Sequence, residues 1–218
     1  MEQEIKMCPH GRDINQMCPH CLGTNETVID TPVAASALTP EPEKEPVKEV
    51  VNEETNRMLM MFPILKKIVP AHNNKSRLVL EEDIEYVSKQ AQVLHEICMV
   101  GAYAMHHSQI ESDDPMNFFV TKDRKIVINP KITRHSNYFA DSKEGCMSFL
   151  DKEQVIVPRW QKCEVEYQTI MVDPENKDKF KLSSVIEESL SGKDAHVYQH
   201  EFDHGEAKFI YQLEVKKE

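Results

Sequence analysis

The chain has 218 residues, with 26 Lys and Arg against 37 Asp and Glu, and its formal net charge is −11 at pH 7. This acidic balance argues against a nucleic-acid binder, because such a protein needs a basic patch to displace counterions from phosphates. No apolar run approaches the roughly 18 residues of a membrane-spanning helix, and the N-terminus lacks the apolar core of a signal peptide. We therefore expect a cytoplasmic protein that neither enters a membrane nor binds nucleic acid directly.

Composition divides the chain into three zones. Residues 1–24 hold three of the six cysteines, which without an export signal are expected to be thiols or metal ligands rather than disulfides. Residues 25–55 are rich in Pro and Glu and contain no aromatic residue, which predicts a flexible acidic linker. All Phe, Tyr and Trp residues follow, so the packed domain is predicted at 56–218.

The first predicted helix runs from Glu81 to Met105, because apolar residues recur there at spacings of three and four. A β-hairpin is predicted next, with its turn at Thr121–Arg124, and the polar segment 173–178 is predicted to join two further strands. The predicted strands are 118–120, 125–128, 155–157, 164–172 and 180–182.

A second helix is predicted to begin after Ser191. This residue would be its N-cap, Asp194 would be the acidic partner in a capping-box-like pattern, and Gly205 would end the helix. The order of helix, several strands and helix predicts an α+β fold with an antiparallel-rich sheet.

The sequence HEFDH at residues 200–204 carries a candidate chemistry. In a helix, His200 and His204 lie one turn apart on one face, so both imidazoles can bind one divalent metal. Glu201 is rotated by about 100° from His200, where its carboxylate can shuttle a proton without ligating the metal. The alternative interpretation is a pair of surface histidines on an acidic helix.

A third metal ligand is expected upstream of this segment. Zinc peptidases with an HExxH motif take it from downstream, but only fourteen residues follow His204 and none of them is a histidine. Glu206 is too close, and Glu214 is a poor candidate. The segment EGCMS at 144–148 offers Cys146, whose soft thiolate suits Fe(II), Zn or Ni.

The two segments resemble signatures of the peptide deformylase family. The family's E-G-C-x-S is present at 144–148 and its Q-H-E-x-D-H at 199–204, in the expected order and separation. Further similar segments are VPR at 157–159, INPKIT at 128–133 and MFPILKKIVP at 61–70. The resemblance covers about 56–218 and implies an antiparallel-rich sheet packed around a central metal-binding HExxH helix.

The resemblance implies hydrolysis of the N-formyl group from the N-terminal methionine of nascent polypeptides, with release of formate. Cys146, His200 and His204 would hold one divalent metal, with Fe(II) favoured over Zn or Ni, and Glu201 would move the proton. The implied partners are N-formylmethionyl peptides or nascent chains, and the ribosome, in the cytoplasm of a bacterial or bacterial-host cell.

Other positions take roles from the same resemblance. The side-chain amide of Gln109 and the backbone N–H of Met147 would stabilise the oxyanion. Glu144 and Arg159 match a family pair that braces the ligand loop, whereas a surface ion pair would contribute little. Asp203 would either accept a hydrogen bond from a ligand imidazole or face solvent.

Substrate side chains are expected in an apolar pocket beside the metal helix. By position, His196 and Val197 would line this pocket, although His196 replaces an apolar family residue and fits a satisfied surface or core histidine equally well. The peptide is expected to bind in extended form along a strand edge.

The first family signature departs from its pattern in AMHHSQI at 104–110. Gln109 takes the place of the family glutamine, but His106 and His107 replace the usual small residues. GEA at 205–207 also replaces the usual Leu-x-Gly. We expect the altered segment to change the active-site rim and substrate geometry more than the chemistry, and the divergence suggests a phage-type member.

The remaining sulfur-containing residues are interpreted from their positions. A second, structural zinc is predicted near the N-terminus, held by Cys8, Cys18 and Cys21 with His10 or His20. Family members lack this segment, and a tail of free thiols is the alternative. Cys98 falls on the buried stripe of the first helix, Cys163 precedes a strand, and Met58–Met61 are predicted to lie in the core.

Two other functions remain open at this point. An HExxH metallopeptidase would keep its metal in a Cys146→Ser variant, whereas a deformylase would lose or change it. A non-catalytic deformylase-like module could instead bind nascent chains or a partner, which the altered AMHHSQI segment favours. The presence of all three ligands and of Glu201 argues against this second alternative.

Overall fold

The computed structural model describes residues 53–177 and 179–214, which all belong to one compact unit, Glu49–Glu218. The predicted N-terminal zinc ligands therefore lie outside the described residues, as does nearly all of the predicted linker 25–55. The first described helix, α1, begins at Glu53, within that predicted linker. None of the described helices is both long and apolar enough to cross a membrane.

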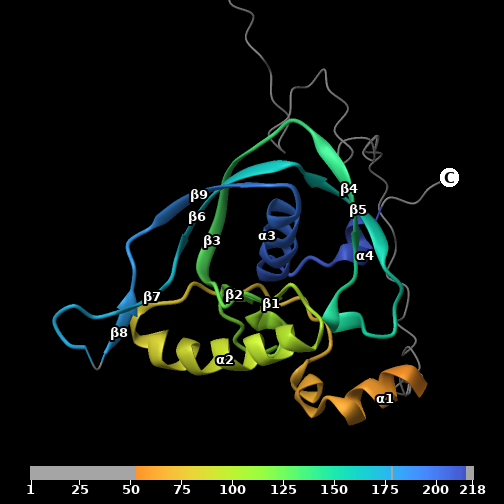
Figure 1. Ribbon diagram of the computed structural model, residues 1–218, viewed down its shortest axis with the longest axis horizontal. Coiled ribbons are helices and arrows are strands. Elements are labelled where there is room, and N and C mark those ends of the chain that lie inside the picture. Colours follow the sequence, from red (N-terminus) through yellow and green to blue (C-terminus); the bar gives the residue numbers. More distant parts are fainter. Residues whose placement is uncertain (1–52, 178, 215–218) are drawn as a thin grey trace, which may run out of the picture. The chain divides into compact units, whose positions relative to one another are not determined.

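Two α-helices precede the strands along the described chain and two follow them (Figure 1). The α-helices are α1 (Glu53–Met61), α2 (Ile84–Val100), α3 (Gly192–Gly205) and α4 (Ile210–Leu213). The strands are β1 (Ala104–His106), β2 (Phe118–Thr121), β3 (Ile126–His135), β4 (Phe139–Glu144), β5 (Val155–Trp160), β6 (Lys162–Gln168), β7 (Ile170–Val172), β8 (Phe180–Leu182) and β9 (Ile186–Ser191). Short 3-10 helices occupy Pro63–Lys67, Glu81–Asp83, His107–Gln109 and Met147–Phe149.

The strands form three antiparallel sheets. The largest has the order β1-β2-β3-β6-β9, and the pairs β4-β5 and β7-β8 form the other two. Figure 1 shows α3 in the middle, between the long strands of the large sheet and the β4–β5 pair. This arrangement confirms the predicted α+β fold with an antiparallel-rich sheet around the HExxH helix.

The large sheet is covered by α2 on one face and by α3 on the other. In β2, Phe118 and Val120 pack in the core that contains α2, whereas Phe119 packs with Ala195 and Tyr198 of α3. Successive side chains of a strand point to opposite faces, so a strand between two helices is apolar throughout. The sheet thereby fixes α3 against a buried apolar surface.

The first helix is shorter than its apolar pattern predicts. It begins with the 3-10 turn Glu81–Asp83 and ends at Val100, not at Met105. Residues 104–106 form β1, and Ala104 and Met105 pair with Thr121 and Val120 of β2. The apolar stripe continues past Val100 because β1 is buried too, and strand pairing overrides the helical period there.

The hairpin of β2 and β3 and the turn between β7 and β8 are confirmed. The strand predicted at 164–172 is instead two strands, β6 and β7, which belong to different sheets. Details of the second helix differ from the prediction. Ser191 is the N-cap residue of α3, but its side chain makes no capping hydrogen bond. Gly205 is the last helical residue rather than the residue after the helix, and the left-handed conformation falls on Ala207, with φ of 54°.

The buried cysteines and the methionine cluster differ in outcome. Cys98 and Cys163 are at most 1% exposed, and burial raises the pKa of their thiols to about 12 and about 11. The predicted core position of Cys98 is confirmed, whereas Cys163 lies within β6 rather than before a strand. Met60 and Met61, by contrast, are 79% and 62% exposed. Helix α1 contacts the core only along Met58 and Leu59, because one side of a short peripheral helix must face solvent.

Candidate metal centre

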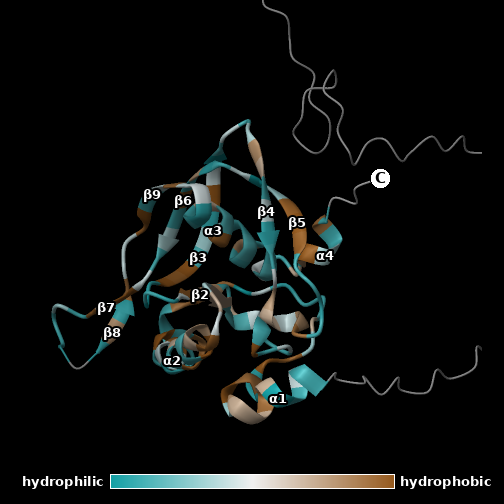
Figure 2. Ribbon diagram, turned by 45° about the vertical axis from the view of Figure 1, so that its right-hand side comes forward, coloured by the Kyte–Doolittle hydropathy of each residue, from teal (hydrophilic) through white to brown (hydrophobic). Residues whose placement is uncertain are grey.

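Helix α3 carries hydrophilic residues although it lies between the strands (Figure 2). Gln199 ties it to β5, since its amide donates to the carbonyl of Trp160 and accepts from the N–H of Trp160, both at 2.9 Å. Tyr198 donates its hydroxyl proton to the carbonyl of Glu166 in β6 at 3.2 Å. A helix held on two sides in this way presents its remaining polar residues at fixed positions.

The three predicted metal ligands, two of them from α3, lie close together. Ligand atoms of Cys146, His200 and His204 all lie within 4.8 Å of one another, and Cys146 Sγ is 3.3 Å from His204 Nε2. A tetrahedral metal with ordinary bond lengths would separate a sulfur and a nitrogen ligand by about 3.5 Å. Cys146 is the N-cap residue of the 3-10 helix Met147–Phe149, and this turn directs its thiol towards α3. The donor set and its spacing therefore fit a single divalent metal.

Behind His200 lies a buried network of charges. Its Nδ1 is 2.9 Å from Glu144 Oε2, and Arg159 donates twice to the same carboxylate, at 2.9 and 2.8 Å. Burial acts to raise the pKa of Glu144, but hydrogen bonds from Arg159 and His200 lower it to about 2. Asp203 contacts neither ligand imidazole in this network; it accepts from Arg159 at 2.5 Å. Glu144 thus orients His200, and Arg159 joins both carboxylates.

Behind His204 there is no such acceptor among the described residues. Its Nδ1 is buried without a hydrogen-bond partner, and burial lowers the pKa of the imidazole. Aromatic rings surround it instead: the rings of His106 and Phe209 lie 6.5 and 5.7 Å away between centroids. Packing therefore holds this ring, whereas a hydrogen bond holds the ring of His200.

Glu201 is 3% exposed, and its Oε2 has no hydrogen-bond partner. Burial raises the pKa of this carboxyl to about 7. An unpartnered buried carboxylate oxygen is costly to maintain, and such groups concentrate where a structure performs chemistry. The geometry is that of a proton acceptor next to the metal ligands.

Gln109 brings an amide to the same place. Its Oε1 accepts from the N–H of His106 at 2.9 Å, and so its Nε2 points towards Ser148 Oγ and Cys146 Sγ, at 3.2 and 3.6 Å. The N–H of Met147 opens the 3-10 helix that follows Cys146, and first-turn N–H groups have no partner within their own helix. Both predicted donors thus lie beside the ligand cysteine.

The altered segment at 104–110 does not place its two histidines at the active-site rim, as was predicted. His106 and His107 are both 0% exposed, so neither forms the active-site rim. The ring of His106 stacks towards His204, while His107 stacks on Phe118 on the α2 side of the sheet. The sequence pattern flagged both positions as unusual, but only the tertiary structure places His106, the last residue of β1, towards α3 and His107, the first residue of the 3-10 helix, towards α2.

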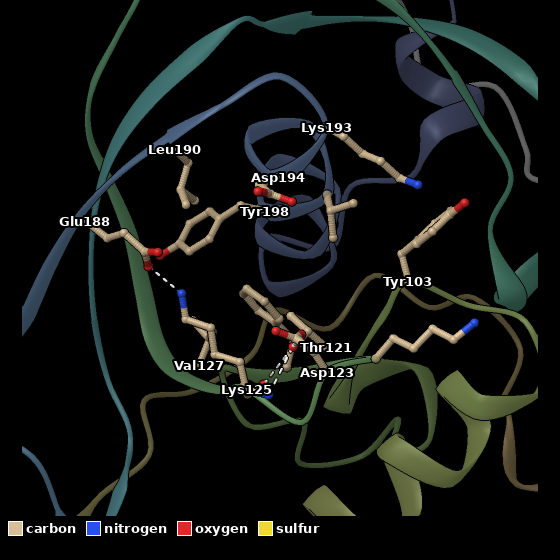
Figure 3. Close-up of a pocket in the computed structure, with 13 residues that line it drawn as sticks. Tyr103, Thr121, Asp123, Lys125, Val127, Glu188, Leu190, Lys193, Asp194 and Tyr198 are labelled. Atoms are coloured by element: carbon tan, nitrogen blue, oxygen red, sulfur yellow. Dashed lines mark hydrogen bonds and ion pairs between the residues drawn. The ribbon is translucent and has the colours of Figure 1, made fainter.

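A pocket of about 460 Å³ lies beside the N-terminal half of α3 (Figure 3). Of the two residues predicted to line a substrate pocket, Val197 lines this one and His196 does not. Its apolar walls include Phe119, Val127 and Leu190, whereas charged side chains surround them, among them an ion pair that joins Lys125 and Glu188. Val197 and Glu201 are four residues apart and so lie on one face of α3, but neither Glu201 nor a candidate metal ligand lines the pocket.

Comparisons with known proteins identify the family of the chain. A family model described as polypeptide deformylase matches residues 89–218, more than half of the chain. Peptide deformylase 2 of a Nostoc species is 36% identical over 78 residues, which cover 36% of this chain and 37% of that protein. A peptide deformylase of Thermotoga neapolitana is also 36% identical over 78 residues, with 40% of its length covered. The match thus spans less than half the length of these curated relatives.

Solved structures show the same fold over more of the chain. The peptide deformylase of Thermotoga maritima is 25% identical, with a TM-score of 0.55, and the match covers 71% of this chain and 92% of that one. A probable peptide deformylase of Synechococcus phage S-SSM7, at 23% identity and a TM-score of 0.51, shares the fold over 65% of this chain and 91% of its own. With the family model matching the segment that holds all the metal ligands, this chain belongs to the polypeptide deformylase family.

Proposed function

We propose that this protein removes the formyl group from the N-terminal methionine of nascent polypeptides and releases formate. The observation that carries the proposal is the convergence of Cys146, His200 and His204 beside the unpartnered carboxylate oxygen of Glu201. Family membership supports the same reaction class. The substrate, an N-formylmethionyl peptide or nascent chain, follows from that membership and not from a feature of the pocket.

Cys146, His200 and His204 would hold the metal through one sulfur and two nitrogen atoms. A divalent metal at this position supplies a Lewis acid for the formyl carbonyl and makes water nucleophilic at neutral pH. We propose Fe(II) as the metal, because a thiolate together with two imidazoles suits it, and Zn or Ni as substitutes. Activity should therefore decline in air as Fe(II) or the thiolate oxidises.

The protein's own groups divide the remaining work. Glu201 takes a proton from water while the water oxygen bonds to the formyl carbon. The carbonyl oxygen becomes an oxyanion, which accepts hydrogen bonds from Gln109 Nε2 and from the N–H of Met147. When the carbonyl re-forms, the bond between carbon and nitrogen breaks, and Glu201 returns its proton to the departing amine. The products are formate and a free N-terminal amine.

The hydrogen bonds of Gln109 support this assignment. Its Oε1 is occupied by the N–H of His106, so the amide cannot turn over, and Nε2 carries two protons. Its two protons face Ser148 Oγ at 3.2 Å and Cys146 Sγ at 3.6 Å, and we propose that the one beside the ligand sulfur turns to the oxyanion when substrate binds. We propose that Val197, on the helix face of Glu201, contacts the substrate in the pocket that it lines.

The proposal is tested by formate release from a formyl-Met tripeptide, with protein purified anaerobically and loaded with Fe(II). Wild type should release formate, and Glu201→Gln should be slower by about 10²- to 10⁴-fold, since it keeps the shape but not the base. Glu206→Gln is the matched control, because Glu206 is partly exposed and pairs with Lys75 away from the ligands. Its rate should equal that of wild type.

Absence of release from wild type that still binds one metal at this site would contradict the proposal and favour the non-catalytic module. A metallopeptidase is distinguished by two further measurements. It would cleave unformylated peptides, and Cys146→Ser would leave its metal bound. The contact between Cys146 Sγ and His204 Nε2 at 3.3 Å supports the deformylase arrangement over that alternative.

The N-terminal zinc stays a separate proposal, based on the sequence. Cys8, Cys18 and Cys21 would bind it with His10 or His20, as a small module that could contact the ribosome or another partner. Zinc-loaded full-length protein should then contain two equivalents of metal, and Cys18→Ser should contain one. Equal metal content in both proteins would refute the second site.

A further inference from the structure

Gly205, the last residue of α3, lies unusually close to two side chains. A Cβ at this position would meet Asn117 Oδ1 at 2.7 Å and His106 Nε2 at 3.3 Å. The backbone of Gly205 is not in the left-handed region; among the described glycines that conformation belongs to Gly192. Glycine is therefore required at 205 by lack of space and not by backbone conformation.

His106 is oriented within this contact by its hydrogen bonds. Its Nδ1 accepts from the N–H of Ser108 at 3.1 Å, and its Nε2 lies 3.4 Å from Asn117 Oδ1. Because Nδ1 is an acceptor, the ring proton is on Nε2 and faces the amide oxygen. The backbone of Asn117 is held as well, since its N–H donates to the carbonyl of Arg77 and its carbonyl accepts from the N–H of Asn129.

The same group of residues holds the end of α3 that carries His204. Ser108 Oγ lies 3.4 Å from the carbonyl of His204, and the N–H of Ser76 donates to the carbonyl of Gly205 at 2.9 Å. The ring of His106 stacks towards that of His204, with an angle of 25° between the planes. No hydrogen bond orients His204 at its Nδ1, so the surrounding rings restrain it: His200, Phe209 and His106, at 5.0, 5.7 and 6.5 Å between centroids.

We infer that His106 is the positioning residue for the metal ligand His204, and that Gly205 is the matched small residue that lets the ring fit. The inference rests on the metal site of the proposed function. It concerns how the ligand is held rather than which reaction follows. A bulky ring in β1 and a missing side chain in α3 compensate each other in volume, so the pair should behave as a unit.

The experiment measures Co(II) binding to the full-length chain by competition with a chromophoric chelator, together with the thiolate-to-Co(II) charge-transfer spectrum. His106→Ala should weaken Co(II) binding by about 10-fold or more and change the spectrum, because His204 can then turn. His106→Phe keeps a ring of similar size and should stay within about threefold of wild type. His106→Asn keeps an acceptor for Ser108 but no ring, and should behave like alanine.

His107→Ala is the matched control for loss of a buried histidine. His107 is adjacent and equally buried, but it is directed towards α2, and its ring stacks on Phe118. This variant should lower the Tm of the metal-free protein while Co(II) affinity and spectrum stay those of wild type. Weakening of Co(II) binding by His107→Ala as large as that by His106→Ala would overturn the inference, because the effect would then be general destabilisation.

A double-mutant cycle tests the match between the two positions. Gly205→Ala alone should weaken Co(II) binding, because the added Cβ would lie 2.7 Å from Asn117 Oδ1 and 3.3 Å from His106 Nε2, so these side chains must shift. In the His106→Ala background Asn117 can turn into the vacated space, so the loss caused by Gly205→Ala should be at least about threefold smaller. Equal losses in both backgrounds would overturn the match.

The readouts separate this inference from the proposed function. Wild type that does not bind Co(II) would overturn the metal site itself, and the inference with it. Wild-type affinity and spectrum in His106→Ala, or a Phe variant as weak as the Ala variant, would overturn the positioning role alone. The deformylase proposal would then stand or fall on formate release.

Discussion

His200 and His204 lie one helical turn apart in α3, yet the groups behind them differ. The Nδ1 atom of His200 is 2.9 Å from Glu144, which is paired with Arg159. The Nδ1 atom of His204 has no partner among the described residues, and aromatic rings pack around it. One ligand is thus oriented by charge and the other by volume, so substitutions that remove charge and those that remove volume should act on different halves of the site.

The largest effect is expected on the charged half. Arg159→Met would leave Glu144 and Asp203 buried without their shared cation. Breaking a buried ion pair in this way costs about 3–5 kcal/mol of unfolding free energy. Urea unfolding of the metal-free protein measures the loss. Arg159→Lys is the informative control, since it keeps the charge but loses the bidentate geometry, and full stability in either variant would contradict the charged network.

The next effect is on metal affinity. Glu144→Gln keeps the size of the side chain but removes the charge that Arg159 and His200 face. Loss of such a partner of a metal-bound imidazole lowers metal affinity about 10- to 100-fold, and chelator competition with Zn measures it. Wild-type metal affinity in Glu144→Gln would contradict this prediction, because it would show that a hydrogen bond without the negative charge is enough to orient His200.

The stability of the fold is expected to depend on pH because of His107, the buried histidine next to His106. Burial lowers the pKa of His107 to about 4, with partial compensation by Glu111 and Asp114. In the unfolded chain the pKa is about 6.5, so the unfolded state binds more protons between about pH 4 and 6.5 and stability falls as pH falls through that window.

His107→Phe should remove part of this dependence. For one proton, the slope is at most about 1.4 kcal/mol per pH unit, and part of it remains because burial also lowers the pKa of His106, to about 3. Urea unfolding of both proteins at pH 4.5, 5.5 and 7 compares the slopes. Parallel profiles for the variant and wild type would show that His107 is not the group responsible.

The smallest effect is expected at the surface ion pair near the end of α3. Lys75 pairs with Glu206 at 2.8 Å, but the two side chains are 68% and 38% exposed. Exposed pairs contribute about 0–1 kcal/mol, so Lys75→Met should change the unfolding free energy by less than about 0.5 kcal/mol. A larger loss would mean that this end of α3 depends on charge after all, and would weaken the contrast between the two halves.

Local patterns in the sequence were sufficient for the fold class and for several elements. The hairpin of β2 and β3 follows from apolar runs around a turn, and α3 follows from its flanking Ser191 and Gly205. The length of α2 did not follow, because a buried strand and a buried helix face are both apolar. Met60 and Met61 were misplaced for a related reason: composition does not say which side of α1 faces solvent.

The candidate metal ligands could be predicted in the same way, because the residue types and their spacing along a helix limit which side chains can reach one metal. A His pair at i and i+4 must share a helix face, and a cysteine in EGCMS is a ready third ligand. How each ligand is held was not readable. The partner of His200 is 56 residues away in the chain, and the residues around His204 come from β1, from the start of β2 and from the segment after α3.

The sequence alone thus predicts the candidate ligands, the candidate base, the helices α2 and α3 and most of the strands, since these depend on neighbours within about one turn or one strand. The tertiary structure decided that His106 packs inside rather than on the rim, that Gly205 must lack a side chain, and that Asp203 reaches Arg159 instead of an imidazole. Each of these depends on contacts between segments far apart in the chain. Such contacts exist only after the sheet has brought those segments together.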